Sequence, residues 1–280
     1  MSDRVTISPF SRVMIPRFLE LSGQEGWVSD PWELEFLLST SARGCFCAVE
    51  ESGAAIGFVT SIRHTRSGWI GNLIVAERYR GRGVGNMLFQ RALQELCAMG
   101  ARTVWLTASA MGKKLYERQG FRRIDSIQRW CSSPPRTRLI RPGSRERSER
   151  TSRAARTSLD CLGWGDRRSA LLKATVERGE VMELNRGFVA IQPVGDGILL
   201  GPFAARDAAT AGRLLEQALT TALPGKKIYL DTPVTNRLAR RLLTVKNLDV
   251  IGCTELMYVG MRPDYRPEHI YGLATMGSCG

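Results

Sequence analysis

A glycine-rich turn between a strand and a helix is the part of this sequence best suited to binding a phosphate. An apolar segment at residues 69–75 is followed by Arg-Gly-Arg-Gly-Val-Gly at residues 80–85 and then by residues with helical spacing. Glycine lets the backbone approach a phosphate closely and adopt conformations that other residues avoid. The free N–H groups and the dipole of a helix start favour negative charge, and arginines add guanidinium donors. The helical spacing also predicts a face buried on the sheet. That face comprises Val84, Met87, Leu88, Ala92 and Leu96.

The motifs around this turn are more specific than glycine alone. The turn reads Arg-x-x-Gly-x-Gly, which is neither the P-loop pattern nor the dinucleotide-binding fingerprint. A strand follows at residues 103–108, and Leu-Tyr and Gly-Phe pairs follow within residues 115–121. Together these motifs resemble those of the GNAT superfamily of acyl-CoA-dependent N-acetyltransferases, with its pyrophosphate loop and its closing helix and strand. The resemblance implies acetyl-CoA as a co-substrate.

The resemblance also assigns cofactor-binding residues on both sides of the turn. These are Ile74, Val75, Arg80, Arg82, Gly83, Val84, Gly85 and Ser109. Backbone N–H groups near Ile74 and Val75 are expected to hold the thioester carbonyl oxygen as negative charge builds up on it. The family commonly has asparagine where this chain has Ser109, and alanine where it has Gly112. Serine still donates one hydrogen bond, so cofactor binding remains the expectation.

Tyr116 is the expected catalytic residue. By resemblance it is the general acid that protonates the departing thiolate. Ser109, Gly112 and Tyr116 are spaced to share one face of the expected helix, where Gly112 leaves room for the pantetheine arm. The alternative is that Tyr116 is a half-buried aromatic residue at a contact between helix and sheet.

The sequence does not fix the base that takes the proton from the amine. Glu25 and Asp30 fall in the loop expected between the first two helices, where such enzymes admit substrate, and Asp231 ends a strand in the second half. We predict these three as candidate substrate contacts, with Asp231 facing a cleft between domains. The alternatives are solvated loop acids and, for Asp231, the cap of a turn. His64 has a suitable ordinary pKa, but a lone histidine at a strand end is usually structural.

Composition limits the class of protein. The 280 residues are 43% hydrophobic and 24% charged, which is typical of a globular chain long enough for two domains. Seven scattered cysteines and two histidines favour reduced thiols and predict no metal site. The start lacks the apolar core of a secretory signal, and no apolar run approaches the roughly 20 residues that span a bilayer. We therefore predict a cytoplasmic protein that does not enter a membrane. The formal charge of +13 is spread along the chain, so nucleic acid is not the expected partner.

The second half of the sequence repeats the layout of the first half. The apolar strand at residues 73–75 corresponds to residues 199–202, and the strand at 104–108 corresponds to 228–233. The turn after the second copy of the first strand lacks glycine and contains Asp207, which would repel a phosphate. The second half thus keeps the fold without the cofactor site, and it resembles the degenerate C-terminal domain of a bacterial tandem-GNAT group.

These patterns predict an α/β fold with an α+β mixed sheet. We expect two tandem GNAT-like domains, each a twisted, mostly antiparallel sheet flanked by helices. Residues 1–131 form the predicted catalytic acyl-CoA-binding domain, residues 132–143 a linker that begins Ser-Ser-Pro-Pro, and residues 144–280 the degenerate domain. The arginines at 132–157 fit either a basic arm for nucleic acid or, as the repeat favours, a linker and the wet face of a helix.

The function predicted from the sequence is N-acetylation. The enzyme would move an acetyl group from acetyl-CoA to a primary amine by direct attack in a ternary complex. Its acceptor would be a small-molecule amine or an amino acid-like compound, and it would need no metal. Transfer of a longer acyl group and a non-catalytic acyl-CoA sensor or interaction module are the alternatives. The sequence leaves open the acceptor, the general base, the acyl preference and any oligomer.

Overall fold

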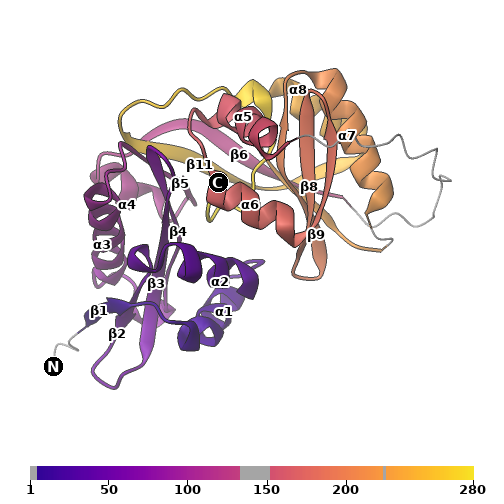
Figure 1. Ribbon diagram of the computed structural model, residues 1–280. Helices are drawn as coiled ribbons and strands as arrows, with labels where there is room; N and C mark the ends of the chain where they lie inside the picture. Colours follow the sequence, from indigo (N-terminus) through magenta and orange to yellow (C-terminus); the bar gives the residue numbers. More distant parts are fainter. Residues whose placement is uncertain (1–4, 133–151, 223–224) are drawn as a thin grey trace.

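The computed structural model of the chain describes residues 5–132, 152–222 and 225–280. Within these ranges one continuous sheet contains twelve strands, in the order β1-β2-β3-β4-β5-β11-β6-β10-β9-β8-β7, with β12 paired to β9 (Figure 1). Most neighbouring strands are antiparallel, and helices flank the sheet. The predicted fold class is therefore confirmed.

The first half opens with a strand and then runs α-α-β-β-β-α-β-α-β. Its strands are β1 (Thr6–Pro9), β2 (Phe46–Val49), β3 (Ala55–Arg63), β4 (Ser67–Val75), β5 (Thr103–Ala108) and β6 (Arg122–Ser132). Its helices are α1 (Ile15–Gln24), α2 (Pro31–Thr40), α3 (Val84–Ala98) and α4 (Lys113–Arg118), with short 3-10 turns at Arg12–Met14, Ala42–Gly44 and Glu77–Tyr79.

The second half repeats the α-α-β-β-β-α-β-α-β order. Its helices are α5 (Arg153–Trp164), α6 (Ser169–Arg178), α7 (Ala208–Thr221) and α8 (Arg237–Val245). Its strands are β7 (Glu180–Leu184), β8 (Gly187–Val194), β9 (Gly197–Ala205), β10 (Ile228–Pro233), β11 (Leu248–Gly260) and β12 (Ile270–Gly272), with a 3-10 turn at Pro267–His269. The internal repeat read from the sequence is present. Of the predicted linker at 132–143, all but Ser132 lies outside the described residues.

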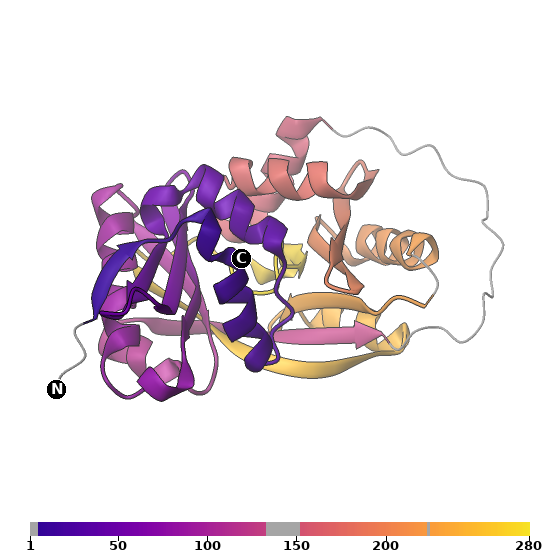
Figure 2. The same ribbon diagram turned by 90° about the horizontal axis from the view of Figure 1, so that it is seen from below.

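The two halves exchange their last strands. β11 from the second half lies between β5 and β6 and pairs antiparallel with both. β6 from the first half pairs with β10 on its other side. Seen from below, β6 and β11 run side by side from one half of the molecule toward the other (Figure 2). The domain limits predicted at 131 and 144 therefore divide the chain but not the sheet, and they remain a prediction.

Helix α3 shows how the periodic pattern becomes a packed face. Val84, Leu88, Ala92 and Leu96 are all buried, at intervals of four residues. Met87 was predicted on the same face and is 41% exposed, so that part of the prediction is wrong. The four buried residues already fill the row facing the sheet, and Met87 is turned away from it. Helices α3 and α4 lie together beside strands of the first half, and α1 and α2 lie across the sheet from them (Figure 1).

Aromatic side chains join the halves in a shared core. Trp164 of α5 meets Trp69 of β4 and Trp105 of β5 edge-on, with ring centroids 5.7 and 5.8 Å apart. Tyr265 packs on both Trp105 and Trp164, with centroid distances of 5.8 Å. Burial of aromatic surface contributes strongly to stability. The first half thus depends on the second for part of its core.

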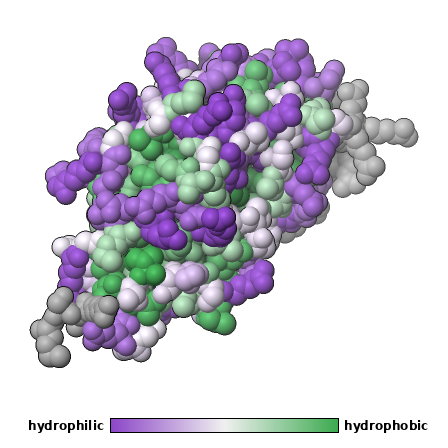
Figure 3. All heavy atoms as spheres, turned by 60° about the vertical axis from the view of Figure 1, so that its left-hand side comes forward, coloured by the Kyte–Doolittle hydropathy of each residue, from purple (hydrophilic) through white to green (hydrophobic). Residues whose placement is uncertain are grey.

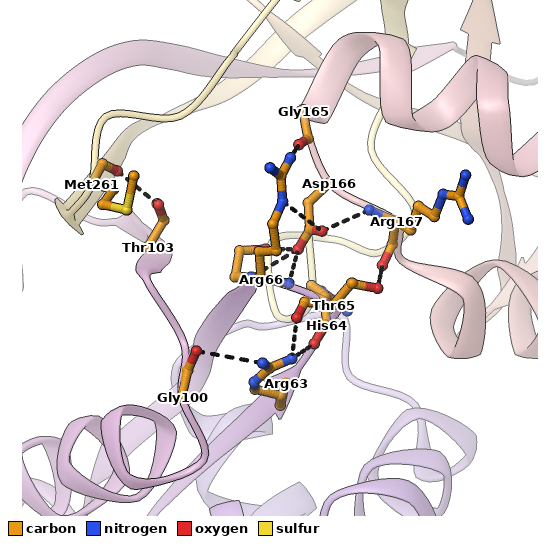
Figure 4. Close-up of polar contacts among 11 residues, drawn as sticks. Arg63, His64, Thr65, Arg66, Gly100, Thr103, Gly165, Asp166, Arg167 and Met261 are labelled. Carbon is orange, nitrogen blue, oxygen red and sulfur yellow. Dashed lines mark hydrogen bonds and ion pairs between the residues drawn. The ribbon is translucent and has the colours of Figure 1, made fainter.

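A buried carboxylate makes a second junction between the halves. Asp166, which follows α5, accepts hydrogen bonds from the backbone N–H groups of Arg66 and Ser67 at 2.9 and 2.8 Å and from the Ser67 hydroxyl at 2.7 Å (Figure 4). Burial raises the pKa of Asp166, but these hydrogen bonds outweigh it and leave the pKa below its ordinary value. The ionised carboxylate of Asp166 therefore holds the β3–β4 turn against the connection between α5 and α6.

Hydrophilic and hydrophobic side chains gather in separate areas of the surface. On the face seen in Figure 3, a band of hydrophilic side chains separates the hydrophobic areas from one another. In the parts of the chain that the structure describes, no helix is both long enough and apolar enough to cross a bilayer.

Candidate active site

The glycine-rich turn has the backbone that an anion site requires. Gly83 precedes α3 with φ at +84°, and Gly81 has φ at +74°, a region that favours glycine. A Cβ at either position would meet no atom within 4 Å, so the turn leaves open space beside the helix start. The first helical bond runs from the Met87 N–H to the Gly83 carbonyl at 3.0 Å, which leaves the earlier N–H groups free. Val84 and Gly85 carry two of these groups.

The strands beside this turn diverge. β4 and β5 are parallel and pair only through Ser67–Trp69 and Thr103–Trp105. Beyond these residues the facing edges are not hydrogen-bonded to each other, and this includes the predicted contacts Ile74 and Val75. On its other edge the pairing of β4 with β3 is irregular between Phe58 and Thr60, and on the β4 side Asn72 has φ at +54°. The opened edge of β4 is where the thioester is expected to lie.

Tyr116 lies on α4 in an aromatic setting. Its ring is 5.0 Å from that of Phe89 and 6.2 Å from that of Phe121. A Cβ on Gly112 would lie 3.0 Å from the Tyr116 ring, so a larger residue there would require the ring to shift by a few tenths of an ångström. Burial raises the pKa of Tyr116 to about 12, so the hydroxyl stays protonated at neutral pH.

The expected helix face carrying Ser109 is not formed. α4 begins only at Lys113, and Ser109 lies in the preceding turn. There its hydroxyl accepts a hydrogen bond from the Gly112 N–H at 3.3 Å. Glycine at 112 and serine at 109 both favour a turn over an early helix start, which is the physical reason for the difference. Ser109 still faces the same cavity as Tyr116.

A cavity of about 240 Å³ lies between the diverging strands, the α1–α2 loop and a segment of the second half. Its lining residues are Phe18, Gly26, Trp27, Val28, Ser29, Asp30, Glu33, Leu34, Ile70, Gly71, Asn72, Leu73, Thr107, Ser109, Tyr116, Arg129, Thr254, Met276, Gly277 and Ser278. Of the predicted site residues, Asp30, Ser109 and Tyr116 line it. Glu25, Asp231 and the residues of the glycine turn do not.

Glu33 is the residue that the sequence reading missed. It lies on the first turn of α2, faces the cavity, and accepts a hydrogen bond from Asn72 Nδ2 at 3.1 Å. Burial raises the pKa of Glu33, and hydrogen bonds from Ser278 and Asn72 oppose this rise without cancelling it. Acidic residues are common in the first turn of a helix because they complement its dipole, so nothing in the sequence distinguished Glu33 as a site residue.

The loop acids predicted as substrate contacts are engaged by arginines. Glu25 pairs with Arg80 of the glycine turn. Asp30 caps α2 by accepting from the Trp32 N–H at 2.8 Å, and it also pairs with Arg178 of α6. The α1–α2 loop is thus tied both to the turn and to the second half.

Asp231 lies inside the sheet and is 2% exposed. Its two oxygens accept from Arg129 Nε at 2.7 Å and from Arg129 Nη2 at 2.6 Å. Arg129, and not Asp231, lines the cavity. Asp231, which we expected to face a cleft, therefore orients the guanidinium group of Arg129 at the cavity.

The corresponding turn of the second half is built differently. Asp207 caps α7 by accepting from the Thr210 N–H at 2.8 Å, and it pairs with Arg186 at 2.7 Å. The hydrogen bonds from Thr210 and the one from Arg186 lower the pKa of Asp207 to about 2. A fixed negative charge occupies this helix start, as the sequence indicated. Among the described residues, no group of three or more histidine, cysteine or acidic side chains could hold a metal ion.

Comparison with known proteins identifies the family. A model of the Acetyltransferase (GNAT) family matches residues 14–121, and a model of the Acetyltransferase (GNAT) domain matches residues 157–272. The chain therefore belongs to the GNAT acetyltransferase family and carries two such domains in tandem. Membership of this family supports acyltransferase activity in general.

Individual relatives agree with this assignment. N-alpha-acetyltransferase MAK3 of Arabidopsis thaliana is 30% identical over 123 residues, which are 40% of this chain and 63% of that protein. A solved structure from Pyrococcus horikoshii is 19% identical with a TM-score of 0.81, covering 99% of this chain and 96% of its own. A GCN5-related N-acetyltransferase from Sphaerobacter thermophilus is 16% identical with a TM-score of 0.62, covering 99% and 100%. At these identities the solved structures are evidence for the fold alone.

Proposed function

We propose that this protein is an N-acetyltransferase that moves an acetyl group from acetyl-CoA to a primary amine within a ternary complex. The observation that carries the proposal is that Glu33 and Tyr116 line the same cavity, beside the opening between β4 and β5. A carboxylate with a raised pKa and a phenol held protonated are the base and the acid that this reaction needs.

The glycine turn suits the phosphates of acetyl-CoA. Free N–H groups of Val84 and Gly85, at the positive end of a helix of 15 residues, would hold a pyrophosphate in the open space beside Gly83. Arg80 and Arg82 would add positive charge. The unpaired edge of β4 near Ile74 and Val75 would bind the arm and the thioester carbonyl oxygen. Ser109 would add a hydrogen bond.

Two side chains would move the protons. Glu33 accepts a proton from the bound ammonium group, and the neutral amine then attacks the acetyl carbon. As the carbon–sulfur bond breaks, Tyr116 donates its hydroxyl proton to the sulfur, so CoA leaves as a thiol. The nitrogen then gives up a second proton, which restores the hydroxyl of Tyr116, and the first proton leaves Glu33 for solvent. The net result is one amide, one thiol and one released proton.

The test is turnover by the purified full chain. We expect release of CoA thiol from acetyl-CoA that depends on a primary amine, with the acetylated amine detected by mass spectrometry. Acyl-CoAs with longer chains are run beside it to compare the acyl groups. Binding of acetyl-CoA with no amine-dependent release across a broad panel would instead identify an acyl-CoA sensor.

A further inference from the structure

A short segment of the second half forms one wall of the cavity. We call residues 275–278 the acceptor wall; its last three residues line the cavity. Two side chains of the diverging strands, Trp69 Nε1 and Thr107 Oγ1, donate to the Gly277 carbonyl at 3.1 and 2.9 Å. Arg129 Nη2 donates to the Met276 carbonyl at 2.9 Å. The acceptor wall is therefore fixed to both β4 and β5, across the gap between them.

The acceptor wall is also fixed from within. Thr275 is 3% exposed, and its hydroxyl accepts from the Cys279 N–H at 2.9 Å and from the Ser278 hydroxyl at 3.3 Å. Its contact with β4 is close: a Cβ on Gly71 would lie 2.2 Å from the Ser278 carbonyl oxygen. Glycine at 71 permits this approach, and no room remains there for an acceptor chain to pass.

Behind the cavity lies a second one of about 20 Å³. Four residues line both and so lie between them: Val28, Asp30, Glu33 and Met276. Met276 and Val28 are the apolar members of this partition, and both pack against the buried group containing Val194 and Leu199. The side chain of Met276 thus ends the larger cavity on the side of the second half.

Charge defines what the larger cavity would hold. Asp30 is paired with Arg178, and Arg129 is paired with Asp231. Among the residues that the structure describes, Glu33 has no cation within salt-bridge distance, and its hydrogen-bond partners are the neutral side chains of Asn72 and Ser278. The uncompensated charge in the cavity is therefore one carboxylate, which favours a cationic amine.

We infer that the acceptor is a small primary amine bound in this cavity, that the acceptor wall excludes the amino terminus of a protein, and that Met276 sets the greatest length of the acceptor. This inference rests on the proposed acetyl transfer. At about 240 Å³ the cavity is smaller than the roughly 300–1,000 Å³ of sites for drug-sized ligands. A peptide gains about 3.3–3.6 Å with each residue and must leave the cavity after the first one or two.

The experiment compares acceptors across variants. The wild-type chain is assayed with acetyl-CoA and short alkylamines, long alkylamines and a peptide with a free amino terminus. Met276→Ala and, from the α1–α2 loop, Val28→Ala enlarge the cavity, while the exposed Met261→Ala is the matched control. We expect the wild type to prefer a short amine. Both enlarging variants should raise the ratio of kcat/KM for long over short amines by about 10-fold, which is the discrimination that one methylene group gives in an apolar pocket. Met261→Ala should leave this ratio unchanged.

Each outcome decides the matter. Wild-type acetylation of the peptide as efficient as that of the best short amine overturns the inference while leaving acetyl transfer intact. An unchanged ratio in both Met276→Ala and Val28→Ala also overturns it, and since these substitutions lie on different segments, misfolding of one leaves the other to report. Absence of acetylation with every acceptor in the wild type overturns the proposed function itself.

Discussion

Asn72 Nδ2 donates a hydrogen bond to Glu33 Oε1 across 3.1 Å, and it lies equally close to the Thr60 hydroxyl. Asn72 sits at the irregular point of β4, with φ at +54°, which is uncommon outside glycine. The bond ties the first turn of α2 to the strand that would carry the thioester. The carboxylate of Glu33 is thus positioned by the same residue that breaks the regular pairing of β4.

The first prediction concerns the proton acceptor. Glu33→Gln should reduce kcat by about 10²–10⁴-fold, because the amide cannot take a proton from the ammonium group. Because burial raises the pKa of Glu33 above its ordinary value of 4.5, wild-type kcat should rise with pH along a limb whose midpoint exceeds 4.5. The variant should lose this limb. A pH–rate profile with a saturating amine measures both effects.

The same helix supplies the control for this prediction. Glu35 is exposed and pairs with Arg12 at 2.7 Å, away from the cavity. Glu35→Gln should therefore keep both the rate and the pH profile of the wild type. Equal losses in the two variants, or an unchanged limb in Glu33→Gln, would exclude Glu33 as the base.

The second prediction concerns the departing thiol. Tyr116→Phe should lower kcat by about 10²–10⁴-fold while the Kd for acetyl-CoA stays near that of the wild type, since the hydroxyl acts in the transition state. Because burial raises the pKa of Tyr116 to about 12, its ionisation should cause no fall in rate below that pH. Calorimetry and steady-state kinetics separate binding from turnover. Tyr258→Phe, on β11, is the control, and full activity of Tyr116→Phe would remove the assigned role.

The third prediction concerns the glycine turn. Gly83→Asp should abolish binding of acetyl-CoA, because a carboxylate would stand where the phosphates bind. Gly53→Asp is closely matched: Gly53 has φ at +86°, Gly83 has +84°, and neither has an atom within 4 Å of a built Cβ. Both variants bear the same backbone strain of about 1–2 kcal/mol. Calorimetry should therefore show that Gly83→Asp loses acetyl-CoA binding and that Gly53→Asp keeps it. Tight binding of acetyl-CoA by Gly83→Asp would show that the phosphates do not bind at this turn.

Local chemistry made part of this protein predictable. Glycine at 83 must accommodate a positive φ before a helix, and spacing by four residues buries Leu88 and Leu96, so the strand, turn and helix could be predicted from residue types. Ser109 directly follows β5 and Tyr116 lies on the next helix; both line the cavity, although the helix face predicted to carry them together is not formed. The repeated order of strand and helix patterns also predicted a second domain.

Contacts between distant segments could not be predicted in this way. The residue pattern of a single segment does not say which strands it will pair with, and β6 and β11 each pair with strands of the other half. Residues 275–278 have no periodicity, and their role depends on hydrogen bonds to Trp69 and Thr107. Asp231 was read as a site acid because its partner, Arg129, lies 102 positions earlier in the chain.

The last prediction uses the histidine at the junction between the halves. His64 is 7% exposed, and its Nε2 is buried without a hydrogen-bond partner. Burial, together with the charges of Arg168 and Arg63, lowers the pKa of His64 from 6.5 to about 3, against the opposing charge of Asp166. The unfolded chain therefore binds a proton over this range and the folded chain does not. Neutral His64 therefore stabilises the folded state fully above pH 6.5, and this stabilisation is lost as the pH falls toward 3.

Substitution of this histidine should therefore reduce the sensitivity of the fold to acid. Between pH 7 and pH 5 the wild type should lose about 2 kcal/mol of unfolding free energy through His64, at about 1.4 kcal/mol for each pH unit below the unfolded pKa. His64→Asn removes this loss, whatever its effect on stability at pH 7, while the other histidine serves as the control in His269→Asn. Urea denaturation at both pH values gives the differences. If His64→Asn and the wild type lose the same free energy on acidification, protonation of His64 does not oppose folding, and the junction around Asp166 derives its acid sensitivity from its carboxylates.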